Sequence, residues 1–190
     1  MIALVPVKPF GVAKRRLSDR FTPPQRRKLG MAIAAHTISV TADAGLEPRI
    51  VTGSDEVAAW ADHLGVGVVE EPPGGGLDGA ARAGVRSAAG SPWMVIHADL
   101  PALDVADLTA LTDAGPGAIA PSHDGGTSAV TGISDDIEFS YGPGSFHRHL
   151  AAHPTLAVVC RPGLAYDLDD TADYDVIVTL GSGRWMGEIT

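Results

Sequence analysis

Short apolar runs alternate with segments of helical periodicity along most of the 190-residue chain. The apolar runs predict strands at residues 2–7, 49–52, 66–69, 92–97, 118–120, 127–130 and 156–160. The segments between them predict helices at residues 22–44, 54–64, 80–89, from 104 onward, 145–153 and 171–179. This alternation is typical of an α/β fold with a mainly parallel central sheet. The run at 92–97 is strongly apolar, so we expect it to be a central strand.

Polar and glycine residues at the ends of these segments support the boundaries. Pro23 suits the first position of a helix, and Gly65 suits the position just after one. The glycine-rich stretch 70–79 is expected to be a loop that leads into the helix at 80–89. The expected N-caps are Thr22, Ser54, Asp104, Ser145 and at least one of Asp169 and Asp170.

Length and composition predict one globular domain over residues 1–190. The hydrophobic fraction is 45%, and no stretch approaches the roughly 20 apolar residues that cross a membrane. The first residues lack the features of a signal peptide, so we expect a cytoplasmic protein without a membrane partner. The single cysteine, Cys160, excludes an internal disulfide, and its apolar neighbours predict a buried structural thiol.

The positive charge is concentrated at the beginning of the chain. Eight of the fourteen Lys and Arg residues lie in the first 28 positions beside one acid, Asp19, whereas the whole chain carries a net charge of -9. The acidic remainder argues against nucleic-acid binding, which needs a broad positive face. The basic loop 8–16 directly follows a predicted strand, which is a suitable place to bind phosphates of a small molecule. Residues 26–28 are better interpreted as a solvated helix face.

Acidic residues at two other places, after the strand at 92–97 and near the C-terminus, predict a metal site. Asp99 comes directly after the strand at 92–97, and Asp167 and Asp169 share one face if their backbone is extended. Carboxylates that converge on one pocket need a cation, and hard oxygen ligands suit Mg²⁺ or Mn²⁺. Structural alternatives stay open, because Asp99 could cap a turn and the run 14–16 could be solvated.

Other motifs carry less information. The loop 11–14 lacks the spacing and the Ser/Thr of a Walker A motif, and the glycines at 142 and 144 lack the dinucleotide fingerprint. Those two glycines are interpreted as positions where backbone N–H groups can approach an anion. The histidines at 147, 149 and 153 have no Cys or Glu partner nearby, which argues against a zinc site.

Taken together, six motifs resemble one known family over nearly the whole chain. They are Val5-Pro-Val-Lys-Pro-Phe-Gly-Val-Ala-Lys-Arg-Arg-Leu17, Gly76-Leu-Asp-Gly-Ala-Ala-Arg-Ala-Gly84, His97-Ala-Asp-Leu-Pro101, Gly125-Gly-Thr127, Phe139-Ser-Tyr-Gly-Pro-Gly-Ser145 and Asp167-Leu-Asp169. In this order they are similar to the guanylyltransferases of deazaflavin coenzyme F-420 biosynthesis. The resemblance implies a three-layer, Rossmann-like fold of the nucleotide-diphospho-sugar transferase type with a mainly parallel sheet.

The resemblance also implies roles for individual residues, taken motif by motif. GTP would be bound by Lys8, Lys14, Arg15, Gly76, Leu77 and Asp78. Asp99, Asp167 and Asp169 would hold Mg²⁺, in two ions for which Mn²⁺ could substitute, and together with Lys14 they would be the catalytic residues. The carboxylate of the acceptor would be bound by Thr127, Gly142 and Ser145. The family usually has Asn where this chain has Asp78, and an acid cannot donate the hydrogen bonds of an amide.

The implied reaction joins GMP from GTP to phosphoenolpyruvate, a small phosphorylated three-carbon acid. The abundance of Arg, Ala and Gly suggests a GC-rich genome such as an actinomycete's, where the family is associated with this acceptor. Alternatives are 2-phospho-L-lactate or 3-phosphoglycerate as acceptor, a molybdenum-cofactor or sugar-phosphate nucleotidyltransferase, and a non-catalytic nucleotide-binding protein. The sequence leaves the oligomeric state open, with a homodimer as one option.

Overall fold

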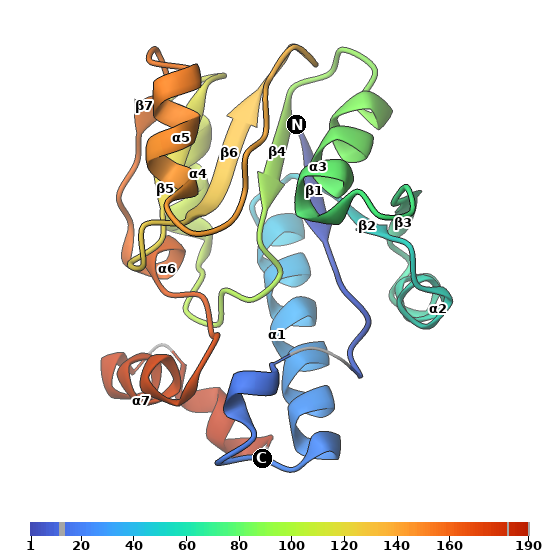
Figure 1. The fold of residues 1–190 in the computed structure, drawn as a ribbon, viewed down its shortest axis with the longest axis vertical. Helices are drawn as coiled ribbons and strands as arrows, with labels where there is room; N and C mark the ends of the chain where they lie inside the picture. The colour runs from blue at the N-terminus through green and yellow to red at the C-terminus, as the bar shows by residue number, and fades with distance from the viewer. Residues whose placement is uncertain (12–13, 182, 190) are drawn as a thin grey trace.

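In the computed structural model, which describes residues 1–11, 14–181 and 183–189, a seven-stranded sheet has the order β3-β2-β1-β4-β6-β5-β7 (Figure 1). Its strands are β1 (Ile2–Pro6), β2 (Glu47–Thr52), β3 (Gly67–Glu70), β4 (Trp93–Ile96), β5 (Ala118–Pro121), β6 (Thr127–Gly132) and β7 (Ala157–Val158). Only β6 is antiparallel to its neighbours, β4 and β5. The predicted mainly parallel sheet is confirmed, and so is the central place of the strand at 92–97, which is β4.

Helices connect the strands and extend beyond the sheet. The α-helices are α1 (Pro23–Asp43), α2 (Asp55–Leu64), α3 (Gly76–Ser87), α4 (Val105–Asp113), α5 (Ser145–Ala152), α6 (Pro162–Ala165) and α7 (Thr171–Leu180). Two 3-10 helices, η1 (Arg15–Leu17) and η2 (Arg184–Glu188), precede α1 and follow α7. Thr22, Asp104 and Asp170 occupy the predicted N-cap positions, and Gly65 ends α2 in the left-handed conformation. No helix in these described ranges is both long and apolar enough to span a membrane.

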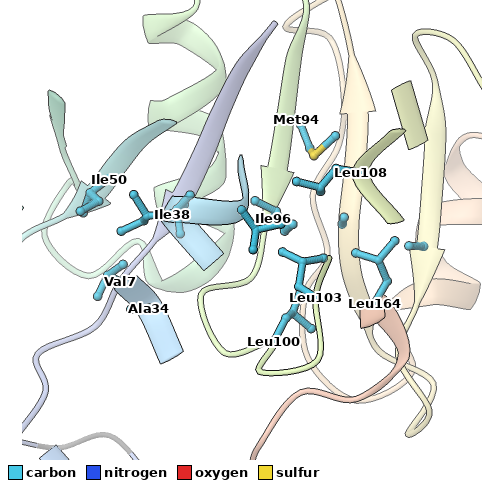
Figure 2. Close-up of a cluster of buried hydrophobic side chains, with 14 of the residues drawn as sticks. Val7, Ala34, Ile38, Ile50, Met94, Ile96, Leu100, Leu103, Leu108 and Leu164 are labelled. Atoms are coloured by element: carbon cyan, nitrogen blue, oxygen red, sulfur yellow. The ribbon is translucent and has the colours of Figure 1, made fainter. Parts of the chain in front are cut away.

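Two hydrophobic clusters fill the space between the sheet and the helices on its two faces. Side chains of α1, α2 and α4 pack on one face, and Figure 2 shows Ala34 and Ile38 of α1 beside Val7, Ile50 and Ile96. Helices α3 and α5 cover the other face around the buried Trp93 of β4. The alternation of strand side chains between these two clusters gives the three layers that the resemblance implied.

A third hydrophobic cluster lies beyond the sheet and joins the two ends of the chain. Leu17, Phe21 and the first turns of α1 pack there against Leu168 and the buried side of α7. Figure 1 shows α1 extending past the sheet toward η1, α7 and the C-terminus. This cluster brings the basic N-terminal segment next to the C-terminal acids.

Helix α3 begins four residues earlier than the sequence predicts. We expected residues 70–79 to form a loop, but Gly76, Leu77 and Asp78 form the first turn of α3. A Cβ atom at Gly84 would lie 3.2 Å from side-chain atoms of Leu4 and Val51, so the helix sits very close to the sheet. Burial of this small-residue face outweighs the poor intrinsic helix propensity of glycine.

The prediction for Cys160 was wrong. The strand expected at 156–160 is only the two exposed residues of β7, which pair with β5 at the edge of the sheet. Cys160 lies after this edge strand and is exposed. An apolar run predicts a buried strand only where another element covers it, and nothing in the described part of the chain covers β7 on both faces.

Candidate active site

A cleft of about 370 Å³ opens at the carboxyl ends of β1 and β4. Lys8 and Lys14 line it from the segment after β1, and His97 and Asp99 line it from the segment after β4. Asp167 and Asp169 also line the cleft, as expected for two acids on one face of an extended segment. Residues 12–13 of the basic loop lie outside the described residues.

Lys14 is the centre of the charged part of the cleft. Its Nζ donates to Asp99 Oδ2 at 2.6 Å and lies 3.6 Å from Asp169 Oδ1, although its side chain is only 8% exposed. Burial favours the neutral amine, but the nearby Asp99 outweighs burial and raises the pKa of Lys14. In return Lys14 holds the pKa of Asp99 below its usual range despite burial. Both groups are therefore charged at neutral pH.

The backbone of Lys14 adopts the left-handed conformation, with φ at 56°. For a residue with a side chain this conformation costs on the order of 1 kcal/mol, and such positions cluster at functional sites. The ion pair with Asp99 fixes the Lys14 side chain in the cleft in spite of this cost. Arg16 adds a more distant and exposed cation, since its Nη1 lies 3.8 Å from Asp169 Oδ2.

Three side chains could together bind a divalent cation. Each of His97, Asp99 and Asp167 offers a ligand atom, and these atoms lie within 4.8 Å of one another. Burial, reinforced by the nearby Asp99 and Asp169, raises the pKa of Asp167 to about 7, because both effects disfavour its charged form. Two carboxylates and one imidazole fit Mg²⁺ or Mn²⁺, of which Mn²⁺ accepts a nitrogen ligand more readily. Asp169 faces Lys14 and Arg16 instead.

Hydrogen bonds to backbone groups fix the segment of Asp167 and Asp169 relative to Asp99 and to α7. The N–H of Leu168 donates to the carbonyl of Asp99 at 2.9 Å, which places Asp167 and Asp169 on either side of this contact. The carboxylate of Asp173 in α7 accepts the N–H groups of Asp169 and Asp170, each at 2.9 Å. The first turn of α7 therefore positions the acids of the cleft.

The residues implied to bind GTP are only partly brought together. Lys8, Lys14 and Leu77 line the cleft, whereas Arg15 is exposed in η1 and does not line it. Gly76 and Asp78 lie in the first turn of α3, one on each side of Leu77, and are also outside the lining. The Asp78 carboxylate accepts the backbone N–H of Tyr141 at 2.7 Å, so here it connects α3 to the segment before α5.

The residues implied to bind the acceptor form a separate hydrogen-bonded cluster. Thr127 and Ser145 are each 1% exposed, and their hydroxyl groups lie 3.2 Å apart. Gly142 adopts φ 111° and accepts the N–H of Ser145, which is the first residue of α5 rather than its N-cap. The N-cap is Gly144, so the predicted capping role of Ser145 was wrong, and its hydroxyl reaches Thr127 instead. None of these three residues lines the cleft of Lys14.

The sequence analysis considered the histidine of this cluster, His149, only as a zinc ligand and did not predict its contact with Thr127. His149 Nε2 accepts the N–H of Ser140 at 2.9 Å, so its proton lies on Nδ1, 2.9 Å from Thr127 Oγ1. Burial lowers the pKa of His149 to about 4, which agrees with this neutral form. Its position on the buried face of an amphipathic α5 was the one available signal.

His97 and Glu71 were also missed, although both line the cleft. His97 follows β4 and stands two residues before Asp99, a spacing that places both at the carboxyl end of that strand. Glu71 follows β3 in the same way. A search of all polar residues just after parallel strands, not only of Asp and Lys, would have found both.

Solved structures share this fold. A protein from Desulfovibrio desulfuricans classed with the nucleotide-diphospho-sugar transferases has a TM-score of 0.82 at 16% identity, over 98% of this chain and 94% of its own. A nucleotidyl transferase from Methanothermobacter has a TM-score of 0.67 at 18% identity, over 96% and 97%. At these identities the likeness concerns the fold alone, and it confirms the fold class that the sequence implied.

Sequence comparison gives a more specific result. Residues 1–186 match the family model described as guanylyl transferase CofC like. A protein of Nocardia farcinica named phosphoenolpyruvate guanylyltransferase is 36% identical over 195 aligned residues, which cover 95% of this chain and 86% of that protein. The match thus includes both the N-terminal basic segment and the C-terminal acids.

Proposed function

Because the chain belongs to the CofC-like guanylyl transferase family, we propose that it transfers GMP from GTP to the phosphate of phosphoenolpyruvate. The products are enolpyruvyl-diphospho-guanosine and pyrophosphate, and the reaction belongs to coenzyme F-420 biosynthesis. The name of the relative from Nocardia farcinica supports this acceptor over 2-phospho-L-lactate and 3-phosphoglycerate.

The single observation that carries the proposal is the buried Lys14 between Asp99 and Asp169 in the cleft. A buried cation surrounded by carboxylates is suited to hold a phosphate chain together with a metal ion. Lys8 lies at the same cleft and adds a second cation for the triphosphate. Both substrates are polyanions, so the main catalytic task is to neutralise their charge and to fix their approach.

We assign Mg²⁺ to Asp99 and Asp167, with Asp169 beside them and His97 within reach. When bound, the cation neutralises phosphate charge and polarises the α-phosphorus for attack. Lys14 pairs with the acids and can turn its ammonium group to the triphosphate as negative charge develops on the leaving pyrophosphate. The same proposal includes a second Mg²⁺ ion at these acids and the replacement of Mg²⁺ by Mn²⁺.

The reaction needs no general base from the protein. The phosphate of phosphoenolpyruvate is already ionised at neutral pH, so one of its oxygens can attack the α-phosphorus directly. The bond between the α-phosphorus and the bridging oxygen breaks as the new one forms, and pyrophosphate leaves from the opposite side. The residues of the cleft orient the substrates and hold charge, and the cluster of Thr127, Gly142 and Ser145 is assigned to the carboxylate of the acceptor.

Pyrophosphate release tests the proposal. The protein is incubated with GTP and Mg²⁺, and with phosphoenolpyruvate, 2-phospho-L-lactate or 3-phosphoglycerate in separate reactions, and the new diphosphate is identified by ³¹P NMR. We expect turnover with phosphoenolpyruvate and at least tenfold lower kcat/KM with the other two. Faster turnover with either of those acids would show that this acid is the acceptor, and no turnover with any of the three would refute the function.

Two further properties, the cytoplasmic location and a homodimeric state, remain predictions.

A further inference from the structure

Glu71 differs from the other acids of the cleft because its carboxylate has no partner. It is half-buried and lines the cleft, yet among the described residues its side chain makes no ion pair and no hydrogen bond. Its backbone N–H donates to Thr52 at 3.0 Å, which fixes this residue at the end of β3. Asp99 and Asp169, in contrast, are paired with Lys14.

Glu71 also lies at the opposite end of the cleft from the charged cluster. It follows β3, whereas His97 and Asp99 follow β4, and the order β3-β2-β1-β4 puts three strand spacings between them. Three spacings amount to roughly 14 Å. Leu77, in the first turn of α3, lines the same cleft and is apolar, and α3 packs against β3, the strand that Glu71 follows. The cleft therefore has a cationic and acidic end for phosphates and metal, and, among the described residues, an end where the apolar Leu77 and the unpaired carboxylate of Glu71 lie.

This arrangement fixes the direction in which a nucleoside triphosphate can bind. A carboxylate without a cation repels a phosphate chain, whereas Lys8 and Lys14 attract it. The base must then lie toward Glu71, beside Leu77. A carboxylate offers two adjacent acceptors and no donor. Guanine alone among the common bases presents two adjacent donors, the N1–H and the 2-amino group, whereas adenine presents an acceptor at its N1.

We infer that Glu71 selects guanine by accepting hydrogen bonds from the N1–H and the 2-amino group of the base. The inference rests on the proposed function and deepens it, because it assigns the choice of nucleotide to one residue outside the charged cluster. Hypoxanthine keeps the N1–H but lacks the 2-amino group, so ITP separates the two hydrogen bonds.

Nucleotide binding without an acceptor tests the inference. Calorimetry with Mg²⁺ and GTP, ITP or ATP measures affinity without turnover, for the wild type and for Glu71→Gln. The wild type should bind GTP about tenfold more tightly than ITP and about 100-fold more tightly than ATP. In Glu71→Gln the advantage of GTP over ITP should fall to about twofold or less, while the affinity for ATP should not decrease.

Glu70→Gln is the matched control. Glu70 is the preceding residue, it is exposed at the end of β3, and it does not line the cleft, so the variant removes the same charge without touching the base. Circular dichroism and thermal melting check that both variants fold. The inference is wrong if Glu71→Gln loses the same factor of affinity for GTP, ITP and ATP. It is also wrong if the variant binds GTP tightly and keeps the affinity ratios of the wild type. Neither result contradicts the proposed function. A wild type that binds none of the three nucleotides overturns the proposed function as well.

Discussion

At the scale of single residues, Lys14 combines three properties that rarely occur together. It is buried, it is charged, and its backbone is left-handed. Each property costs free energy on its own, and the contacts with Asp99 and Asp169 offset the cost. A triphosphate that enters the cleft can replace part of these contacts, because the ammonium group of Lys14 is already charged and positioned there.

Asp169→Asn should lower kcat/KM for GTP by about 100-fold or more, because it removes a charge that faces Lys14 and Arg16. Asp169 is 49% exposed, so the free energy of unfolding should change by less than about 1 kcal/mol. Steady-state kinetics and chemical denaturation measure the two effects. Asp170→Asn is the control, since it makes the same change one residue away and Asn is an equally good N-cap. Equal activity in the two variants would remove Asp169 from the catalytic set.

His149 predicts a pH dependence of stability. Its pKa is about 4 in the folded protein and about 6.5 when unfolded, so between these values the unfolded chain binds more protons. The stability that comes from the neutral imidazole is therefore present above pH 6.5 and is lost as the pH falls toward 4, by up to about 3 kcal/mol. Denaturant titrations from pH 4 to pH 8 measure this loss.

His149→Gln should remove that component, while His147→Gln, on the exposed face of the same helix, should not. Asp167 titrates in part of the same range with the opposite sign, because a raised acid pKa stabilises the fold as the pH falls. The quantity to compare is thus the difference between variant and wild type at each pH. A difference that does not vary with pH would show that the neutral His149 contributes nothing.

At the scale of elements, the first turn of α7 connects stability to the site. Asp170 accepts the N–H groups of Ala172 and Asp173, and Asp173 in turn accepts those of Asp169 and Asp170. This reciprocal cap satisfies the free donors of the helix start and at the same time orients the segment that carries Asp167 and Asp169.

Asp170→Ala should lower the free energy of unfolding by about 1 kcal/mol, the usual loss of an N-cap side chain. Because the cap also orients Asp169, kcat should fall by a few-fold as well. Asp170→Ser keeps an oxygen that can accept the same N–H groups, so it should restore most of the stability and activity. Urea denaturation and initial rates for the three proteins test this, and an Asp170→Ala variant as stable as the wild type would contradict it.

At the scale of the whole molecule, the cleft depends on contacts between the two ends of the chain. Lys14 comes from the beginning and Asp169 from near the end, and the cluster of Leu17, Phe21 and Leu168 holds these segments together. A ligand that bridges both segments binds the folded chain and not the unfolded one. The binding free energy of the nucleotide is therefore added to the stability of the whole fold.

GTP with Mg²⁺ at 100 times its Kd should raise the free energy of unfolding by about 2.7 kcal/mol. Lys14→Gln should abolish most of this increase at the same nucleotide concentration, whereas Arg27→Gln, whose guanidinium pairs with Glu56 on the exposed side of α1, should keep it. Denaturation with and without nucleotide measures both. A full increase in Lys14→Gln would exclude Lys14 from the nucleotide site.

Local chemistry explains why much of the fold was predictable. Caps such as Thr22, Asp104 and Asp170 form hydrogen bonds within three residues of themselves. An apolar run such as 92–97 favours burial in any fold that it adopts. The place after a strand indicated Asp99, and the spacing of Asp167 and Asp169 in an extended segment indicated that these two acids share one face. The failures at Gly76 and Cys160 both occur where packing by another element decides whether a segment is helix, strand or loop, and the predicted cap at Ser145 failed because its hydroxyl bonds to Thr127 instead.

By itself, then, the sequence determined the order of the strands and of the longer helices, the mainly parallel sheet with β4 at its centre, and the cations and Asp99 after the strands, because periodicity, caps and strand ends are local properties. Only the tertiary structure decided which charges meet. Lys14 pairs with an acid 85 positions away, the Asp78 carboxylate accepts the backbone N–H of Tyr141, and Glu71 has no side-chain partner among the residues that the structure describes. Such pairings depend on distances of a few ångströms between elements far apart in the chain, and electrostatic and hydrogen-bond energies change steeply over those distances.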